Sequence, residues 1–172
     1  MKTPVACLRW HRPIEIDVSK HGSLVLKGDI SVIPASRGMY VIARRTRTGI
    51  MPVYVGLASR SIRQRVKQHL KSDRMIEELV DGRRSKRLFF YAELTPGGLE
   101  FAKRYLPSFE RALIRSAINA GGATLNRHQR QIRSTHIPRA CSFVNAGHRA
   151  AWIDWSPTRV TTDLLPRRRK SA

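Results

Sequence analysis

Two polar side chains, Arg65 and His69, stand four residues apart in a segment whose apolar residues have helical spacing. Residues four apart share one face of a helix, so the guanidinium and the imidazole would project together beside the stripe of Ile62, Val66 and Leu70. Such a pair could stabilise developing negative charge and move a proton. A solvated basic helix face is the other interpretation of this pattern.

A single carboxylate, Glu110, lies at the margin of a second apolar helical stripe, three and four residues before Leu113 and Ile114. A carboxylate in that position costs free energy unless it is paired or binds a metal ion. Because magnesium typically takes one or two protein carboxylates together with phosphate oxygens, one Glu could suffice as its ligand. An ordinary ion pair or a solvated edge position is the alternative.

Two tyrosines fall on consecutive segments with strand-like composition. Tyr40 opens the predicted strand Met39–Thr46, and Tyr54 lies with Gly56 in the predicted strand Pro52–Ala58. The two strands would form a hairpin, because polar residues that include a glycine separate them. Ordinary core packing is the plainest role for a strand tyrosine, and a pair of hydroxyl groups near a basic helix is the more chemical one.

The remaining elements are predicted from local patterns. Ser59 or Ser61 supplies an N-cap for the helix that carries Arg65. Pro107 is expected to divide the region around Glu110 into two helices. The predicted strands are Ser23–Lys27, Met39–Thr46, Pro52–Ala58 and Arg87–Leu94, and the predicted helices are Ile62–Leu70, Asp73–Val80, Leu99–Leu106 and a last one from Ser108 to Gly121. This order predicts a small α+β domain with antiparallel strands.

The ordered set of these residues resembles the GIY-YIG nuclease superfamily. The residues that carry the resemblance are Gly38-Met39-Tyr40, Tyr54-Val55-Gly56, Arg65, His69, Glu110 and Asn126. The likeness covers residues 37–127 and implies a three-stranded antiparallel sheet flanked by helices. Residues 1–36 are then an N-terminal extension, and residues 128–172 are a basic C-terminal extension with a flexible tail.

The resemblance also implies a role for each matching residue. Tyr40 would contact the nucleophilic water, Tyr54 would orient the water or the phosphate, Arg65 would stabilise transition-state charge, His69 would relay a proton, and Glu110 would hold Mg²⁺ or Mn²⁺. Gly56 and Asn126 would support the site. The general base stays open between Tyr40 and His69: a free tyrosine has a pKa near about 10, and a nearby cation would favour its phenolate.

The chain departs from the family pattern in three places. Met39 and Val55 stand where the motifs have isoleucine, which are apolar exchanges. The gap between the two tyrosines is longer than in compact members and implies a larger hairpin turn. The interval from Gly56 to Arg65 is one residue longer than usual, which makes Arg63 a competitor, although only Arg65 places a histidine one turn later.

The charge of the chain points to a polyanionic partner. Lys and Arg number 33 against 12 Asp and Glu, a formal net charge of +21. Nucleic acid is the first candidate for such a surface, and an acidic membrane is the second. The residues expected to contact phosphates are Arg60, Arg63, Lys67, Arg127, Arg130 and Arg133. Cys141, His136 and His148 match no common zinc-site spacing.

The sequence argues against a membrane-spanning protein, a secreted protein and a disulfide-rich scaffold. No apolar run reaches the length of a membrane-spanning helix, and the first residues have no apolar core of a secretory signal. Cys7 and Cys141 lie too far apart for a disulfide-rich scaffold pattern. These observations predict a cytoplasmic protein without a membrane partner.

The function predicted from the sequence is a divalent-metal-dependent endonuclease that hydrolyses phosphodiester bonds in DNA, of a restriction or mobile-element type. A homodimer would suit an enzyme that makes two cuts. The alternatives are a non-catalytic nucleic-acid-binding protein with the same fold, and a ribonuclease or toxin. RNA stays open as the substrate.

Overall fold

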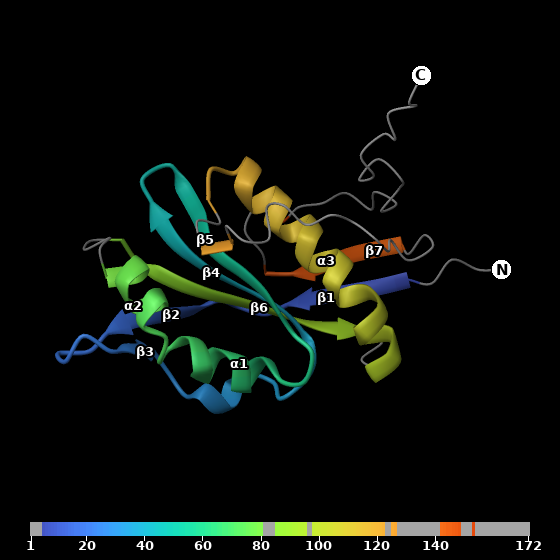
Figure 1. The fold of residues 1–172 in the computed structure, drawn as a ribbon, viewed down its shortest axis with the longest axis horizontal. Coiled ribbons are helices and arrows are strands. Elements are labelled where there is room, and N and C mark those ends of the chain that lie inside the picture. Colours follow the sequence, from blue (N-terminus) through green and yellow to red (C-terminus); the bar gives the residue numbers. More distant parts are fainter. Residues whose placement is uncertain are drawn as a thin grey trace, which may run out of the picture.

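The computed structural model describes residues 5–80, 85–95, 98–122, 125–126, 142–148 and 153. These residues form a mixed sheet of seven strands and three α-helices (Figure 1). The strands are β1 (Val5–Trp10), β2 (Ile14–Val18), β3 (Leu24–Leu26), β4 (Gly38–Thr46), β5 (Gly49–Ala58), β6 (Arg87–Thr95) and β7 (Ser142–Gly147). The helices are α1 (Ile62–His69), α2 (Asp73–Val80) and α3 (Leu99–Asn119), with a 3₁₀ turn at Ile30–Val32.

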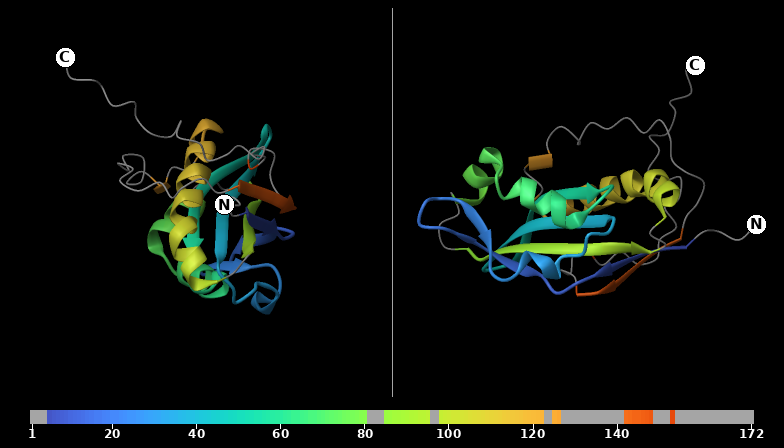
Figure 2. Two further views of the ribbon diagram at one scale, coloured as in Figure 1. Left: turned by 90° about the vertical axis from the view of Figure 1, so that its right-hand side faces the viewer. Right: turned by 90° about the horizontal axis from the view of Figure 1, so that it is seen from below.

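Strand β6 organises the sheet, because other strands pair with both of its edges. Strand β4 runs antiparallel along one edge, and β5 pairs with β4 as its hairpin partner. The other edge is shared end to end: β2 pairs with Arg87–Phe89 and β1 pairs with Ala92–Thr95. Strand β3 pairs with β2, and β7 lies parallel to β1; the right-hand view of Figure 2 shows β7 alongside β1.

The prediction of an α+β fold is confirmed, but the prediction of a small three-stranded sheet is wrong. Strands β4, β5 and β6 are the three expected, and four further strands join them. The N-terminal residues supply three of these, and β7 comes from the expected C-terminal extension. The physical reason lies in β6, which is buried along most of its length, so each of its edges needs a hydrogen-bonding partner.

The region around Pro107 also differs from expectation, since α3 runs unbroken from Leu99 to Asn119. Proline removes one backbone donor and usually kinks or ends a helix. Here the apolar residues on both sides of it, Leu106 and Phe109 among them, belong to the same buried cluster. That shared burial favours one continuous helix over two separate ones.

The other helices and strands follow the predictions closely. The hairpin is confirmed with strand bounds extended by one residue in β4 and by three in β5. Helix α2 has the predicted bounds, and the Ser61 side chain accepts a hydrogen bond from the Gln64 N–H as the N-cap of α1. Within the described residues, no helix has the length and apolar composition needed to cross a membrane.

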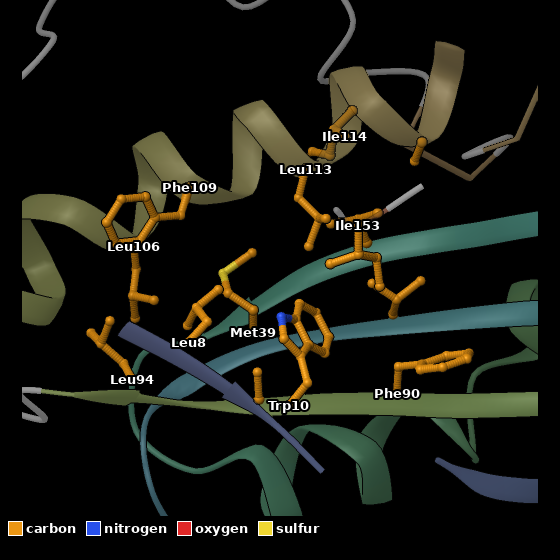
Figure 3. Packing of buried hydrophobic residues seen from close by; sticks show 14 of the residues in the cluster. Leu8, Trp10, Met39, Phe90, Leu94, Leu106, Phe109, Leu113, Ile114 and Ile153 are labelled. Atoms are coloured by element: carbon orange, nitrogen blue, oxygen red, sulfur yellow. The ribbon is translucent and has the colours of Figure 1, made fainter. Parts of the chain in front are cut away.

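Two buried clusters lie on opposite faces of the β4–β6 ladder, since successive strand residues point to opposite faces. Met39 and Val41 join α3 in the first cluster, which also contains Trp10 (Figure 3). Tyr40 and Ile42 join α1 and α2 in the second cluster. The strand β4 therefore contributes alternate residues to an α3 face and to an α1/α2 face.

Candidate active site

The two motif tyrosines come together on the α1/α2 face of the hairpin. Tyr40 is directly opposite Gly56, and Ile42 is opposite Tyr54, so the two phenols are diagonal neighbours. Their ring centroids are 6.0 Å apart. A Cβ at Gly56 would overlap the Tyr40 hydroxyl, so only glycine leaves room for this arrangement. The structure thus gives a steric reason for the glycine of the second motif.

Helix α1 brings His69 onto the two phenols. Ile62 and Val66 anchor the helix in the core, and His69 follows them at the last turn. Its Nε2 lies 2.7 Å from the Tyr40 hydroxyl oxygen, and its ring centroid is 4.9 Å from that of Tyr54. The hydrogen bond joins the two groups that the sequence left as competing candidates for the base.

Burial keeps both of these groups neutral. Desolvation raises the pKa of Tyr40, the neighbouring Tyr54 raises it further, and Arg65 opposes the shift without reversing it. The expectation that a cation would favour the Tyr40 phenolate is therefore outweighed in the free protein. Desolvation, followed by the charge of Arg65, lowers the pKa of His69 to about 4. At neutral pH a neutral phenol thus shares a hydrogen bond with a neutral imidazole.

The two candidate arginines of α1 have different surroundings. The guanidinium of Arg63 donates to the backbone oxygens of Ile33, at 2.6 Å, and Ser31, at 2.8 Å, so it holds the 3₁₀ turn against the helix. Arg65 acts electrostatically on both phenols, and its Nη1 donates to Gln68 Oε1 at 2.9 Å. The structure places Arg65 at the tyrosines and gives Arg63 a bracing role.

Glu110 approaches the same cluster from α3. This helix packs along β5, which among the described strands pairs only with β4. Burial raises the pKa of Tyr54, and the Glu110 carboxylate raises it further. The charge of Glu110, on α3, thus acts on the same phenol as the charge of Arg65, on α1. Four elements, β4, β5, α1 and α3, contribute to one site.

The residues at the site would fit a magnesium or manganese ion that takes one ligand from the protein and the others from phosphate oxygens and water. The described residues contain no group of three or more His, Cys, Asp or Glu side chains suited to a metal ion. Magnesium commonly uses one or two protein carboxylates with substrate phosphates and waters, so it needs no such group. Glu110 is half-buried and its charge raises the pKa of Tyr54, so it is the carboxylate that matches this requirement.

Asn126 fastens the strand that carries Tyr54. Its Oδ1 accepts a hydrogen bond from the Val55 N–H and its Nδ2 donates to the Val55 oxygen, both at 2.8 Å. The side chain is 3% exposed, so it satisfies both backbone groups of this residue away from water. The side chain works as a short substitute for a neighbouring strand, which agrees with the supporting role predicted for it.

The expected phosphate contacts are only partly described. Lys67 is exposed on α1, and Arg60 is exposed just before the helix begins. Arg60 and Arg65 line a pocket of about 330 Å³ together with Leu57, Ser59, Ser61, Gln64 and Gln68. Arg127, Arg130 and Arg133 lie outside the described residues, as do His136 and Cys141 of the unfavoured zinc alternative.

One charged residue at the site was not anticipated from the sequence. Arg74, in the first turn of α2, lowers the pKa of Tyr54 by its positive charge, although burial still raises that pKa. Its Nη2 donates to the Leu125 oxygen at 3.1 Å. Local sequence offers no signal for this role, because the contact joins segments 51 residues apart.

Comparison of the chain with protein-family models, with characterised proteins and with solved structures finds no match in any of the three.

Proposed function

We propose that the protein is a divalent-metal-dependent endonuclease that hydrolyses phosphodiester bonds in DNA. The observation that carries the proposal is the hydrogen bond of 2.7 Å between Tyr40 and His69, with Tyr54, Arg65 and Glu110 acting on the same cluster. Perturbed pKa values concentrated in one place are typical of catalytic sites. The net charge of +21 favours a nucleic-acid substrate.

The Tyr40–His69 pair would remove the proton from the attacking water. Burial makes a free Tyr40 phenolate unfavourable, so Tyr40 can accept a proton only while it passes its own to His69 Nε2. A bound phosphate would add negative charge near the imidazole and raise the pKa of His69 from its low value. The two competing candidates for the base thus become one relay.

The other groups would act on the phosphate. Arg65 would neutralise the charge that develops on its oxygens, because guanidinium donors match phosphate geometry. Tyr54 would orient the water or the phosphate through its hydroxyl. Glu110 would hold a divalent ion, which when bound supplies Lewis-acid stabilisation of the phosphate. Asn126 would keep Tyr54 in register by fixing the adjacent Val55.

The test is cleavage of supercoiled plasmid by the purified protein with magnesium, with manganese and with a chelator. The proposal predicts metal-dependent nicking or linearisation that is lost in Glu110→Ala. Glu100→Ala is the matched control, because Glu100 is an exposed carboxylate of the same helix, paired with Lys103. It should cleave as the wild type does.

The outcomes separate the alternatives. Discrete fragments would indicate a site-specific enzyme of restriction or mobile-element type. Salt-sensitive DNA binding without cleavage by the wild type would contradict the proposal and favour a non-catalytic binding protein. Cleavage of RNA alone would overturn the choice of DNA and indicate a ribonuclease.

A further inference from the structure

Arg74 is anchored to the same piece of backbone that fixes Tyr54. Its Nη2 donates to the oxygen of Leu125, and the next residue, Asn126, holds both backbone groups of Val55. A chain of short contacts therefore links the first turn of α2 to the strand residue beside Tyr54. The anchor limits the positions that this long side chain can take.

Toward the residues that the structure describes, the anchored guanidinium keeps most of its donor capacity. An arginine has five N–H donors, and the bond to Leu125 uses one of them. Arg74 is exposed, so its other donors can be reached from solvent, unlike those of Arg63, which hold the 3₁₀ turn. A positioned, solvent-accessible arginine beside a cluster of hydroxyl groups is suited to binding a phosphate.

The site also presents two arginines from different helices to one phenol. Arg65 on α1 and Arg74 on α2 both act on Tyr54, and Glu110 is the carboxylate that acts on it from α3. Among the described residues, the charged groups that act on Tyr54 are thus two cations and one carboxylate, which favours an anionic ligand. Since the Arg65 charge acts on both phenols and the Arg74 charge acts on Tyr54, Arg65 suits the reacting phosphate and Arg74 suits another one.

We propose that Arg74 binds a second backbone phosphate of the nucleic acid, next to the phosphate held by Arg65. This inference rests on the proposed function, because it assumes a nucleic-acid strand in the site. Arg74 is then a substrate-positioning residue that sets where the strand lies. It would not stabilise the transition state itself.

The experiment measures DNA duplex binding at several salt concentrations, with calcium in place of magnesium, for wild type and variants. Loss of one phosphate contact reduces the slope of log affinity against log salt by about one, so the affinity of the variant relative to the wild type should be about tenfold lower at 0.1 M salt than at 1 M salt. Arg74→Ala should show this loss. Arg74→Lys should keep the slope, because the ammonium retains the charge.

The control variant is Arg47→Ala, which removes the same charge from an exposed position in the hairpin turn. It should retain a steeper slope than Arg74→Ala. Thermal unfolding of Arg74→Ala and Arg74→Lys shows whether loss of the Leu125 contact loosens the fold. Weak binding by both variants together with equal loss of stability would indicate a structural role and overturn the proposal.

Single-turnover cleavage at saturating protein separates this inference from the proposed function. Arg74→Ala should cleave within about tenfold of the wild-type rate once bound, because the reacting phosphate keeps Arg65. A loss of a hundredfold or more at unchanged affinity would instead place Arg74 on the reacting phosphate. If wild type cleaves nothing but Arg74→Ala still lowers the salt slope, only the nuclease assignment fails.

Discussion

The two faces of the β4–β6 ladder bury different kinds of side chain. On the α3 face, Met39 and Val41 belong with Phe90 to a cluster of buried aliphatic and aromatic side chains, and Figure 3 shows Met39 and Phe90 in it. On the α1/α2 face, β4 contributes Tyr40, Ile42 and Arg44 in turn, so this face carries polar as well as apolar side chains. One strand, read with an offset of one residue, thus serves two purposes: the first face stabilises the fold, and the second holds polar groups with shifted pKa values.

The polar face is unfavourable for folding except where its groups find partners. On this face, Tyr40 and His69 satisfy each other through their hydrogen bond. At the other end of the ladder, Arg44 lies directly opposite Arg87, a like-charge pair. Such costs are typical of functional surfaces, which are retained for activity. Stability and chemistry should therefore respond separately to substitutions on the two faces.

The largest effect is expected from Leu113→Ala on the α3 face. Leu113 is fully buried, so its truncation should lower the free energy of unfolding by about 2–5 kcal/mol. Cleavage by the remaining folded protein at low temperature should be largely retained, because Leu113 packs in the cluster on the opposite face of the ladder from Tyr40 and Tyr54. Denaturant unfolding measures the loss.

Leu99→Ala is the matched control for this helix, since Leu99 is 43% exposed. Its free energy of unfolding should change by no more than about 0.5 kcal/mol. A large loss of cleavage in folded Leu113→Ala would contradict the view that the α3 face serves stability and the α1/α2 face serves chemistry.

The next effect is the pH dependence of stability that His69 contributes. Its pKa is about 4 in the folded protein and about 6.5 when unfolded, so the unfolded state binds more protons below neutral pH. Stability is then full above about pH 6.5 and falls as the pH drops toward 4. Between about pH 7 and pH 4.5 the loss due to His69 should be about 2 kcal/mol.

Unfolding of His69→Gln at both pH values isolates this contribution. The variant should lose less stability on acidification than the wild type, by about those 2 kcal/mol. His21→Gln, at an exposed turn, is the control and should behave as the wild type does. Equal acid sensitivity in wild type and His69→Gln would show that the imidazole is not held neutral.

Gly56→Ala should lower both the free energy of unfolding and the rate of cleavage. The added Cβ would overlap the Tyr40 hydroxyl, so the phenol must move away from His69. We expect a loss of about 1–3 kcal/mol in stability and at least about tenfold in cleavage. Gly98→Ala, where a Cβ meets nothing within 4 Å, should retain the wild-type rate. Unchanged cleavage by Gly56→Ala would separate Tyr40 from the reaction.

The smallest effect is expected from Arg44→Met. Within the described part of the chain, the buried Nε and Nη2 of Arg44 have no hydrogen-bond partner. Replacing them with an apolar side chain of similar length should leave the free energy of unfolding unchanged or raise it by up to about 1 kcal/mol. Arg45→Met, next along the strand and exposed, is the control. A clear loss in Arg44→Met alone would mean that the guanidinium is satisfied.

Local sequence patterns predicted the helices and strands that carry the candidate site. They did not predict which strands pair over long sequence distances. The serine cap of α1 and the tyrosine hairpin are encoded by neighbouring residues. Strand β2 also alternates, with Ile14 and Ile16 separated by Glu15, but which edge it joins depends on β6, more than 70 residues away. The predicted helix break at Pro107 is wrong for a related reason. Burial of α3 against the sheet outweighs the local tendency of proline to end a helix.

The family resemblance grouped Tyr40, Tyr54, Arg65, His69 and Glu110, and their role as a site stays a prediction. The pKa shifts of Tyr40 and His69 depend on burial that only the packed fold reveals. The spacing to His69 already favoured Arg65 over Arg63, and the backbone oxygens that accept hydrogen bonds from Arg63 are a second reason that only the fold reveals.

The most direct test of a reactive α1/α2 face is Tyr40→Phe, measured for stability and for cleavage in one preparation. The substitution removes one hydroxyl and keeps the ring that packs on Phe89. We predict a change of less than about 1.5 kcal/mol in the free energy of unfolding and a loss of at least about a hundredfold in metal-dependent cleavage. A folded Tyr40→Phe protein that cleaves at the wild-type rate would contradict the account.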